Sequence, residues 1–365
     1  MTDRGTDPAG IAVACVMLAP GLGGLEQSLV DHCEALLVAR HPVHAVIDPR
    51  WAGRAALERM PLATIMPLAN CNEWDPLAVH RLRSWLRAAA LRVVLTIGRR
   101  ASTLVRRARR RLPEPLQVGV TPNYSLGPLI GLDHVLATTS DLRDALIAAG
   151  QSAARITVVP NLVRLPRDSA PPSADPDRLP AIGALGRFVP RKGFADLIEA
   201  LARLRARGYR FEARLAGSGP EEAELRALAG RLGIEDRLRF PGWITEKRSF
   251  FEALDLLCVP SREEPFGIVV LEGMAHARAT IATDVAGPRE IIRHDSDGLL
   301  VPPAAPEALA DAIAGLLDDP DRRRALGRAG RETVRARYDL PVVARKISEA
   351  LCGLVTRGPT VEPEL

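Results

Sequence analysis

Short apolar runs and amphipathic stretches alternate along most of the chain. Segments with helical periodicity, such as LEQSLVDHCEALLVAR, separate these runs. Apolar, β-branched runs of four to eight residues divided by helical segments are typical of βαβ units around a parallel sheet. The pattern therefore predicts a doubly wound α/β domain over residues 1–165. Its predicted strands begin at Ile11, Val43, Ala63, Arg92, Leu116 and His134.

A proline-rich stretch interrupts this alternation. Residues 166–180 read PRDSAPPSADPDRLP, with five prolines and no apolar period, so we expect a linker there. The alternation restarts with AIGALGR and continues through FEARLAG, RLRF, DLLCVP, ATIAT and GLLVP. We therefore predict a second Rossmann-like domain over residues 181–340. A helix and tail over residues 341–365 could cross back to the first domain.

Length and composition support two soluble domains. The chain has 365 residues, 47% of them hydrophobic and 25% charged, which is more than one core normally organises. The longest apolar run, residues 11–20, is far below the roughly 18 residues of a membrane span. Acidic Asp3 and Asp7 precede it, unlike the basic start of a signal peptide. Five scattered cysteines indicate no disulfide framework or zinc site, so we expect a cytoplasmic protein.

The net charge of +5 lies in the first half of the chain. Through Ser169 there are 20 arginines and no lysine against 14 acidic residues. Seven of these arginines fall between Arg99 and Arg111, in a predicted helix. Such a helix suits an anionic lipid surface, here the cytoplasmic face of the inner membrane, or it is a solvated face. Nucleic acid is not an expected partner, because aromatic residues are 4% of the chain and none interleaves with these arginines.

A glycine-rich turn follows the first predicted strand. The sequence PGLGGLEQ places Gly23 and Gly24 at the start of a helix, where backbone amides can approach a ligand. A tight structural turn explains it equally well. The turn does not fit GxGxxG, which disfavours a nicotinamide dehydrogenase.

The second domain opens with a basic loop, GALGRFVPRKGFADLIEAL. Gly186 and Arg187 lie at the end of a predicted strand, and Lys192 lies in the loop before a helix. Two cations placed there could converge on a phosphate-bearing ligand, whereas the alternative is a solvated surface.

A later segment, SREEPFGIVVLEGMA, combines a loop with a helix start. Pro265 and Gly267 exclude a helix through the loop, so we expect the helix to begin after Gly267 with free amides for an anion. Glu264 then lies in the loop and Glu272 inside the helix. The two carboxylates would face different ends of one ligand.

With these motifs in this order, the sequence resembles the retaining nucleotide-sugar transferases of glycosyltransferase family 4, which have the GT-B fold. The resemblance covers nearly the whole chain. It rests on GRFVPRKG, AGSGP, the PGW turn, EPFGIVVLE, TDVAGPREII and DGLLVPP.

The resemblance implies roles for the predicted site. Arg187 and Lys192 would neutralise the departing diphosphate, while Glu264 would contact donor sugar hydroxyls and Glu272 the ribose. Donor binding would further involve the following residues: Gly186, Gly217, Trp243, Phe266, Gly267 and Ile268.

The resemblance also implies front-face attack with retention, in which a donor phosphate oxygen helps to remove the acceptor proton. Neither cofactor nor metal is expected. The acidic triplets at residues 175–177 and 295–297 are interpreted as structural. The two glutamates are not a glycosidase pair.

The chain departs from the family in its first domain. Pro122 and Ile97 stand where the family often has histidine. One interpretation is that Asn123 or Tyr124 contacts the acceptor instead, together with Gly23 and Gly24. The other is that the donor phosphate alone suffices for acceptor activation and that Pro122 only shapes the loop.

The sequence thus predicts a retaining hexosyltransferase that uses a nucleoside diphosphate sugar, based on UDP or GDP. Its acceptor would be a glycan or lipid-linked glycan in envelope polysaccharide or lipopolysaccharide assembly. The alternative is a catalytically weak relative that binds nucleotide sugar as an assembly or regulatory subunit.

Overall fold

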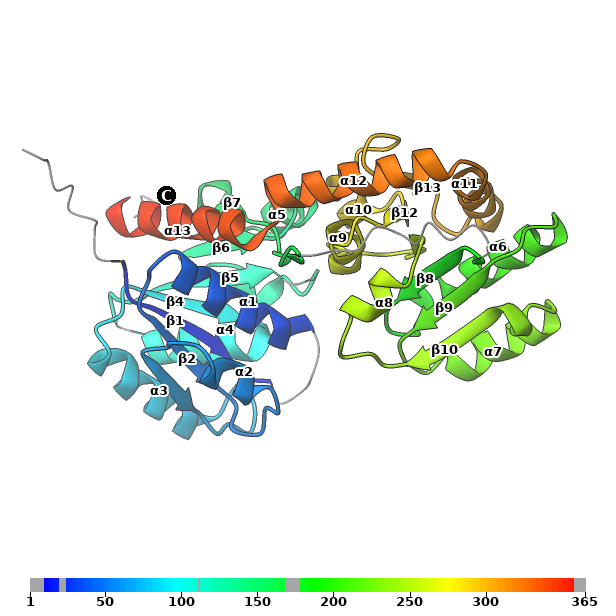
Figure 1. Cartoon of the computed structure of the whole chain (residues 1–365). Helices are drawn as coiled ribbons and strands as arrows, with labels where there is room; N and C mark the ends of the chain where they lie inside the picture. Colours follow the sequence, from blue (N-terminus) through cyan, green and yellow to red (C-terminus); the bar gives the residue numbers. More distant parts are fainter. Residues whose placement is uncertain (1–9, 20–23, 111, 122, 168–177, 358–365) are drawn as a thin grey trace, which may run out of the picture. The chain divides into compact units, whose positions relative to one another are not determined.

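The chain folds into two compact units (Figure 1). The structure is a computed structural model and describes residues 10–19, 24–110, 112–121, 123–167 and 178–357. Unit 1 comprises residues 1–162 and 340–365, and unit 2 comprises residues 163–339. Most of the predicted linker, residues 168–177, lies outside the described residues. No helix in the described ranges is both long and apolar enough to cross a bilayer.

Unit 1 is built on a parallel sheet of seven strands in the order β3-β2-β1-β4-β5-β6-β7. Nearly every residue of its central strands is buried, because helices cover both faces of such a sheet. The order reverses between β1 and β4, which makes a topological switch point there. The strands are β1 (Val13–Met17), β2 (Val43–Ile47), β3 (Thr64–Pro67), β4 (Val93–Ile97), β5 (Leu116–Thr121), β6 (His134–Ala137) and β7 (Ile156–Val158).

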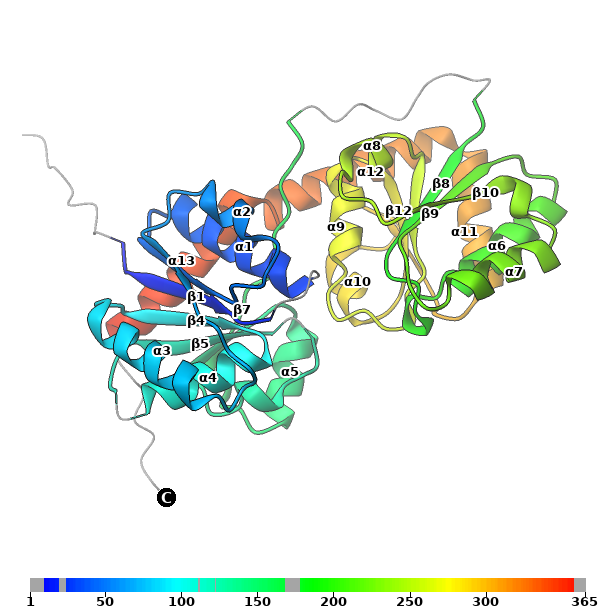
Figure 2. The same ribbon diagram turned by 90° about the horizontal axis from the view of Figure 1, so that it is seen from below.

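Helices from both ends of the chain cover this sheet. Asp75 caps one of them by accepting hydrogen bonds from the Leu77 and Ala78 amides. The last helix, α13, packs beside α1, as Figures 1 and 2 show, and its apolar face joins the unit 1 core. The helices are α1 (Gly24–Val38), α2 (Arg54–Glu58), α3 (Pro76–Ala88), α4 (Arg99–Arg109), α5 (Ser140–Ala148) and α13 (Leu340–Arg357), with 3-10 turns η1 (Gly127–Leu129) and η2 (Ala153–Arg155).

Unit 2 repeats the architecture with six parallel strands in the order β10-β9-β8-β11-β12-β13. Its switch point lies between β8 and β11. One hydrophobic cluster forms on each face of the sheet. The strands are β8 (Ala181–Leu185), β9 (Glu212–Ala216), β10 (Leu238–Gly242), β11 (Leu256–Val259), β12 (Ala279–Thr283) and β13 (Leu299–Val301).

The helices of unit 2 fall between these strands, so the predicted α/β class and its two doubly wound sheets are confirmed. The helices are α6 (Phe194–Ala206), α7 (Glu222–Arg231), α8 (Arg248–Glu252), α9 (Ile268–Ala275), α10 (Ala286–Ile291), α11 (Pro306–Asp318) and α12 (Pro320–Arg337), with 3-10 turns η3 (Pro190–Lys192) and η4 (Glu235–Arg237).

Candidate functional site

The loop after β8 is fixed by a buried aromatic ring. Phe188 is fully buried and packs edge-on against Phe194, with ring centroids 4.7 Å apart. Its neighbour Arg187 is exposed and makes no hydrogen bond or ion pair through its side chain with any residue that the structure describes. The apolar residue of GRFVPRKG therefore anchors the loop, and the cation beside it faces solvent.

Two glycines let three loops meet at the carboxyl edge of the sheet. Gly193 has a φ of 66°, and a Cβ there would lie 2.0 Å from the Pro260 carbonyl oxygen. Gly217 has a φ of 141°, and its Cβ would lie 1.8 Å from the Gly186 carbonyl oxygen. A side chain at either position would separate these loops.

The centre of the site is a contact between Lys192 and Glu264. The Lys192 ammonium donates to Glu264 Oε2, which also accepts from Ser261 Oγ at 3.3 Å. Lys192 follows β8 and Glu264 follows β11, so the pair spans the switch point. Their side chains are 22% and 12% exposed. Both line a small pocket with Phe194 and Val269.

The loop that carries Glu264 leads into α9 as predicted. Gly267 has a φ of 97°, and α9 begins at Ile268. The next loop supports this one, because the Gly287 amide donates to the Glu264 carbonyl oxygen at 2.9 Å. A Cβ on Gly287 would lie 2.2 Å from the carbonyl oxygen of buried Phe266. The TDVAGP segment therefore braces the EPFG segment.

Glu272 lies on α9, and a second lysine binds it. Lys247 Nζ lies 2.5 Å from Glu272 Oε1, and the Glu272 side chain is 14% exposed. Our sequence reasoning missed Lys247. A usable signal existed, because the chain has only three lysines, and two of them contact the two predicted glutamates.

Trp243 lies at the same edge but apart from this contact. It follows Gly242, the last residue of β10, and its side chain is 62% exposed. Trp243 is not among the residues that line the pocket around Lys192 and Glu264.

The predicted acceptor residues lie in unit 1 and are engaged locally. Asn123 Oδ1 accepts from the Ser125 amide at 2.9 Å, and the Tyr124 hydroxyl donates to Asp141. Gly24 is the first residue of α1, whereas Gly23 and Pro122 lie outside the described residues. Ile97 is buried at the end of β4.

Five of the seven arginines between Arg99 and Arg111 have partners within unit 1, and Arg99 and Arg106 are nevertheless exposed. Arg106 donates to two carbonyl oxygens at 2.9 and 2.6 Å, and Arg109 lies 2.7 Å from its carboxylate partner. The partners of Arg99, Arg100, Arg106, Arg107 and Arg109 are, in order, Glu73; Leu18 and Asn70; Pro128 and Ile130; Trp74; and Asp133. Arg111 lies outside the described residues.

The described residues contain no cluster of potential metal ligands. Among the described residues, no three His, Cys, Asp or Glu side chains come together as a metal site would require. The residues at 295–297 take part in local contacts instead, since Asp297 accepts from the Arg293 amide at 2.7 Å and from Thr333 Oγ1 at 2.7 Å.

Two doubly wound sheets, with polar residues meeting at the switch point of the second, define the GT-B class of fold. The crystal structure of Anabaena HepE in complex with UDP and glucose has this fold: it matches with a TM-score of 0.80 at 20% identity, over 94% of this chain and 100% of that one.

Sequence comparison then gives the family. Residues 168–333 match the model of glycosyl transferases group 1. A GDP-mannose-dependent alpha-(1-6)-phosphatidylinositol monomannoside mannosyltransferase of Mycobacterium tuberculosis is 30% identical over 92% of this chain and 96% of its own. The chain belongs to the glycosyl transferases group 1 family.

Another relative matches over a shorter stretch. The lipopolysaccharide core biosynthesis glycosyltransferase LpsD of Rhizobium meliloti is 38% identical over 208 residues, which are 56% of this chain and 58% of LpsD. The match to LpsE of the same organism spans 46% of that protein. This chain thus matches about half the length of each.

Proposed function

We propose that this protein is a retaining glycosyltransferase that moves a hexose from a nucleoside diphosphate sugar to a glycan or lipid-linked acceptor. The observation that carries the proposal is the Lys192–Glu264 contact across the β8/β11 switch point. Ligands of doubly wound sheets bind at this position. A nucleoside diphosphate sugar needs a cation to bind its diphosphate and a hydrogen-bond acceptor to bind its sugar hydroxyls. Lys192 and Glu264 supply these two groups.

The proposed reaction places negative charge on the departing diphosphate. Lys192 and the solvent-facing Arg187 would stabilise that charge, and the first amides of α9, from Ile268 onward, would bind the same phosphates. Glu264 would hold the sugar and Glu272 the ribose. Retention and independence from metal are parts of the proposal, so transfer should persist in excess EDTA and give an α-linked product from an α-linked donor.

The pathway and location are proposed from the relatives. Because LpsD is named for lipopolysaccharide core biosynthesis and the mycobacterial relative for a phosphatidylinositol mannoside, we propose envelope polysaccharide or lipopolysaccharide assembly at the cytoplasmic face of a membrane. Peripheral contact with anionic lipid through residues 99–111 stays a prediction. Most of these arginines have partners inside unit 1, so fewer cations are available to bind lipid headgroups.

The first experiment is a donor screen. Purified protein is heated with UDP, GDP, ADP and their hexose derivatives, and the nucleotide that raises the melting temperature is then used in a donor hydrolysis and transfer assay. Stabilisation with turnover supports the transferase. Stabilisation without turnover, with every donor and glycan acceptor tried, supports instead the weak relative that binds nucleotide sugar. No stabilisation by any nucleotide refutes both.

The second experiment removes the cations. Arg187→Ala and Lys192→Ala should each lower kcat/KM. The expected loss of transition-state stabilisation is roughly 2–4 kcal/mol, the scale for removing one preorganised charge donor. Arg231→Ala, an exposed arginine at the end of α7, is the matched control and should behave as wild type. Unchanged turnover in both site variants would refute the phosphate assignment.

A further inference from the structure

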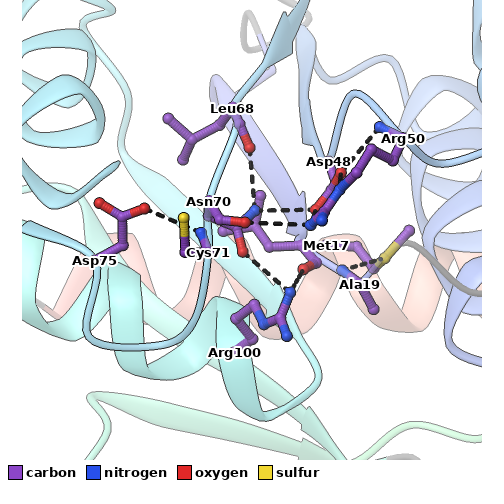
Figure 3. A network of polar contacts seen from close by, with 10 residues as sticks. Met17, Ala19, Asp48, Arg50, Leu68, Asn70, Cys71, Asp75 and Arg100 are labelled. Carbon is purple, nitrogen blue, oxygen red and sulfur yellow. Dashed lines mark hydrogen bonds and ion pairs between the residues drawn. The ribbon is translucent and has the colours of Figure 1, made fainter. Parts of the chain in front are cut away.

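A network of polar side chains crosses the carboxyl edge of the unit 1 sheet (Figure 3). Asn70, which follows β3 and is 5% exposed, is its hub. Its amide nitrogen donates to Asp48 Oδ2 at 3.2 Å and to the Leu68 carbonyl oxygen at 3.1 Å, and its amide oxygen accepts from Arg100 Nη1 at 3.2 Å. The loops that follow β2 and β3 and the start of α4, which follows β4, are thereby joined at one edge.

One side of the network is a compensated ion pair. Asp48 is fully buried, and Arg50 donates to both of its carboxylate oxygens, at 2.9 and 2.7 Å. These hydrogen bonds hold the pKa of Asp48 below its usual range. The carboxylate is therefore ionised near neutral pH, and its charge is matched by Arg50.

The other side is a guanidinium with neutral partners only. Arg100 is half-buried, and its Nη1 donates to Asn70 and, at 3.3 Å, to the Leu18 carbonyl oxygen. Neither its Nε nor its Nη2 hydrogen-bonds to any residue in the described part of the chain. These two nitrogens form the fork that binds a carboxylate or phosphate through two parallel hydrogen bonds.

The carboxylates around this cation are bound by other groups. Glu73 and Asp75 are the other carboxylates of this loop: Arg99 binds Glu73 at 2.9 Å, and Asp75 accepts from the Cys71 amide at 3.0 Å. The hydrogen bond from Arg99 and the charges of Arg99 and Arg100 lower the pKa of Glu73. Arg50 binds Asp48, Arg99 binds Glu73 and backbone amides bind Asp75, so none of these three carboxylates hydrogen-bonds to Arg100. Because a guanidinium cannot lose its proton, a half-buried one with neutral partners favours the arrival of an anion.

We propose that Arg100 binds one oxyanion of the acceptor, a carboxylate or a phosphate, at the β1/β4 switch point of unit 1. This inference rests on the proposed function, because it assigns an anionic acceptor to the same reaction. Nη1 fixes the guanidinium plane through Asn70 and Leu18, so the Nε–Nη2 fork is oriented before the ligand arrives. A purely structural arginine would need only the bonds of Nη1.

The test uses small probes on the full chain. Glucuronate, glucose 6-phosphate and glucose are titrated in ligand-observed NMR against wild type, Arg100→Gln, Arg100→Lys and Arg187→Gln. We expect wild type to bind the two anionic probes more tightly than glucose. Arg100→Gln should weaken the anionic probes at least about tenfold, the scale of a lost charged hydrogen bond, and leave glucose unchanged.

The other variants identify the site. Arg100→Lys keeps the charge but loses the fork, so it should bind the anionic probes with intermediate affinity, and it serves if Arg100→Gln does not fold. Arg187→Gln should leave glucuronate binding unchanged. The preferred probe, glucuronate or glucose 6-phosphate, identifies the anion as carboxylate or phosphate.

Three results would overturn the inference: equal binding of glucose and both anionic probes, full binding in both Arg100 variants, or loss confined to Arg187→Gln. Failure of the proposed function is measured separately, as an absence of nucleoside diphosphate binding to wild type. Probe binding that depends on Arg100 would then survive as an anion site without a transferase.

Discussion

At the scale of single residues, each carboxylate of the candidate donor site is already bound by a lysine. Lys192 contacts Glu264, and Lys247 lies 2.5 Å from Glu272. These bonds fix the carboxylates before any ligand arrives, so less conformational entropy is lost on binding. A ligand hydroxyl that reaches either glutamate must share or replace a lysine hydrogen bond.

Substitution of the two glutamates should affect different ligands. Glu272→Ala should weaken binding of the free nucleoside diphosphate roughly tenfold or more, because ribose is present in donor and product alike. Glu264→Ala should mainly lower turnover of the intact donor. Calorimetry with the diphosphate, followed by rates with the donor, measures both effects. Glu224→Ala, exposed on α7, is the control. Equal losses for both ligands in both site variants would leave only a generic acidic edge.

Lys247 adds a second measurement at the same site. If it orients Glu272, Lys247→Ala should weaken the nucleoside diphosphate in the same direction as Glu272→Ala, and the double variant should lose less than the sum of the two. Additive losses would show that Lys247 acts apart from Glu272.

His134 predicts a pH dependence of stability. It is 4% exposed on β6, and burial lowers its pKa to about 4 from 6.5. The unfolded chain therefore takes up the proton first, so the contribution is full above pH 6.5 and is lost as the pH falls toward 4. The shift corresponds to about 3 kcal/mol of unfolding free energy.

Urea unfolding at pH 7.5 and pH 4.5 measures this effect. His134→Gln should lose less stability between the two pH values than wild type does, because it has no imidazole to protonate. An identical loss in the variant and the wild type would assign the pH dependence to other groups.

At the scale of elements, α4 helps to hold unit 1 together through side chains that composition alone marks as surface charge. Arg109 is 15% exposed and pairs with Asp133, which also accepts from the Gln117 amide at 2.7 Å. Arg109 thus ties α4 to β5 and to the loop before β6. No sequence period identifies Asp133 as the partner of Arg109, because Asp133 lies in a loop that only the sheet order brings to α4.

Arg109→Gln should therefore destabilise unit 1. We expect a loss of about 1–3 kcal/mol in unfolding free energy, because Asp133 would lose a charged hydrogen bond. Arg110→Gln, at the exposed end of α4, is the control and should unfold as wild type. If both variants have the unfolding free energy of wild type, Arg109 does not stabilise unit 1 and α4 is a solvated helix, as its composition suggests.

The membrane prediction belongs to the same element. Co-sedimentation with anionic vesicles should decrease as salt rises, since screening acts over about 8 Å at physiological ionic strength, and Arg110→Gln should reduce it further. Binding that ignores both salt and this substitution would remove α4 from any lipid contact.

At the scale of the whole molecule, the alternation of apolar runs predicted both sheets except for β7, a strand of three residues at the edge of the first. The family motifs predicted which loops form the edge of unit 2. Those motifs are local, so Lys192 and Glu264 could be found one by one. Lys247 and the Asp48–Asn70–Arg100 network could not, because their members come from separate loops and helices and meet only through strand order. Gly23 and Pro122 stay predictions outside the described residues.

The end of the chain completes unit 1. Ile347 and Leu351 of α13 are buried in its core, and Ser348 hydrogen-bonds to His41 at 2.8 Å. Ile347→Ala with Leu351→Ala should lower the unfolding free energy of unit 1 by roughly 4–8 kcal/mol. Unit 2 should keep its transition in calorimetry. Arg345→Ala, exposed on the same helix, is the control, and loss of both transitions together would show that the two units unfold as one.

The scarcity of lysine gives this site a chemical handle. An amine-reactive reagent meets three lysine side chains in the whole chain, and Lys192 and Lys247 are two of them. The third, Lys346, lies on α13 in the other unit. Acylation of this protein, followed by peptide mass spectrometry, therefore reports on one small region against a single internal reference. Protection of Lys192 and Lys247 but not Lys346 would register donor occupancy without any knowledge of the sugar.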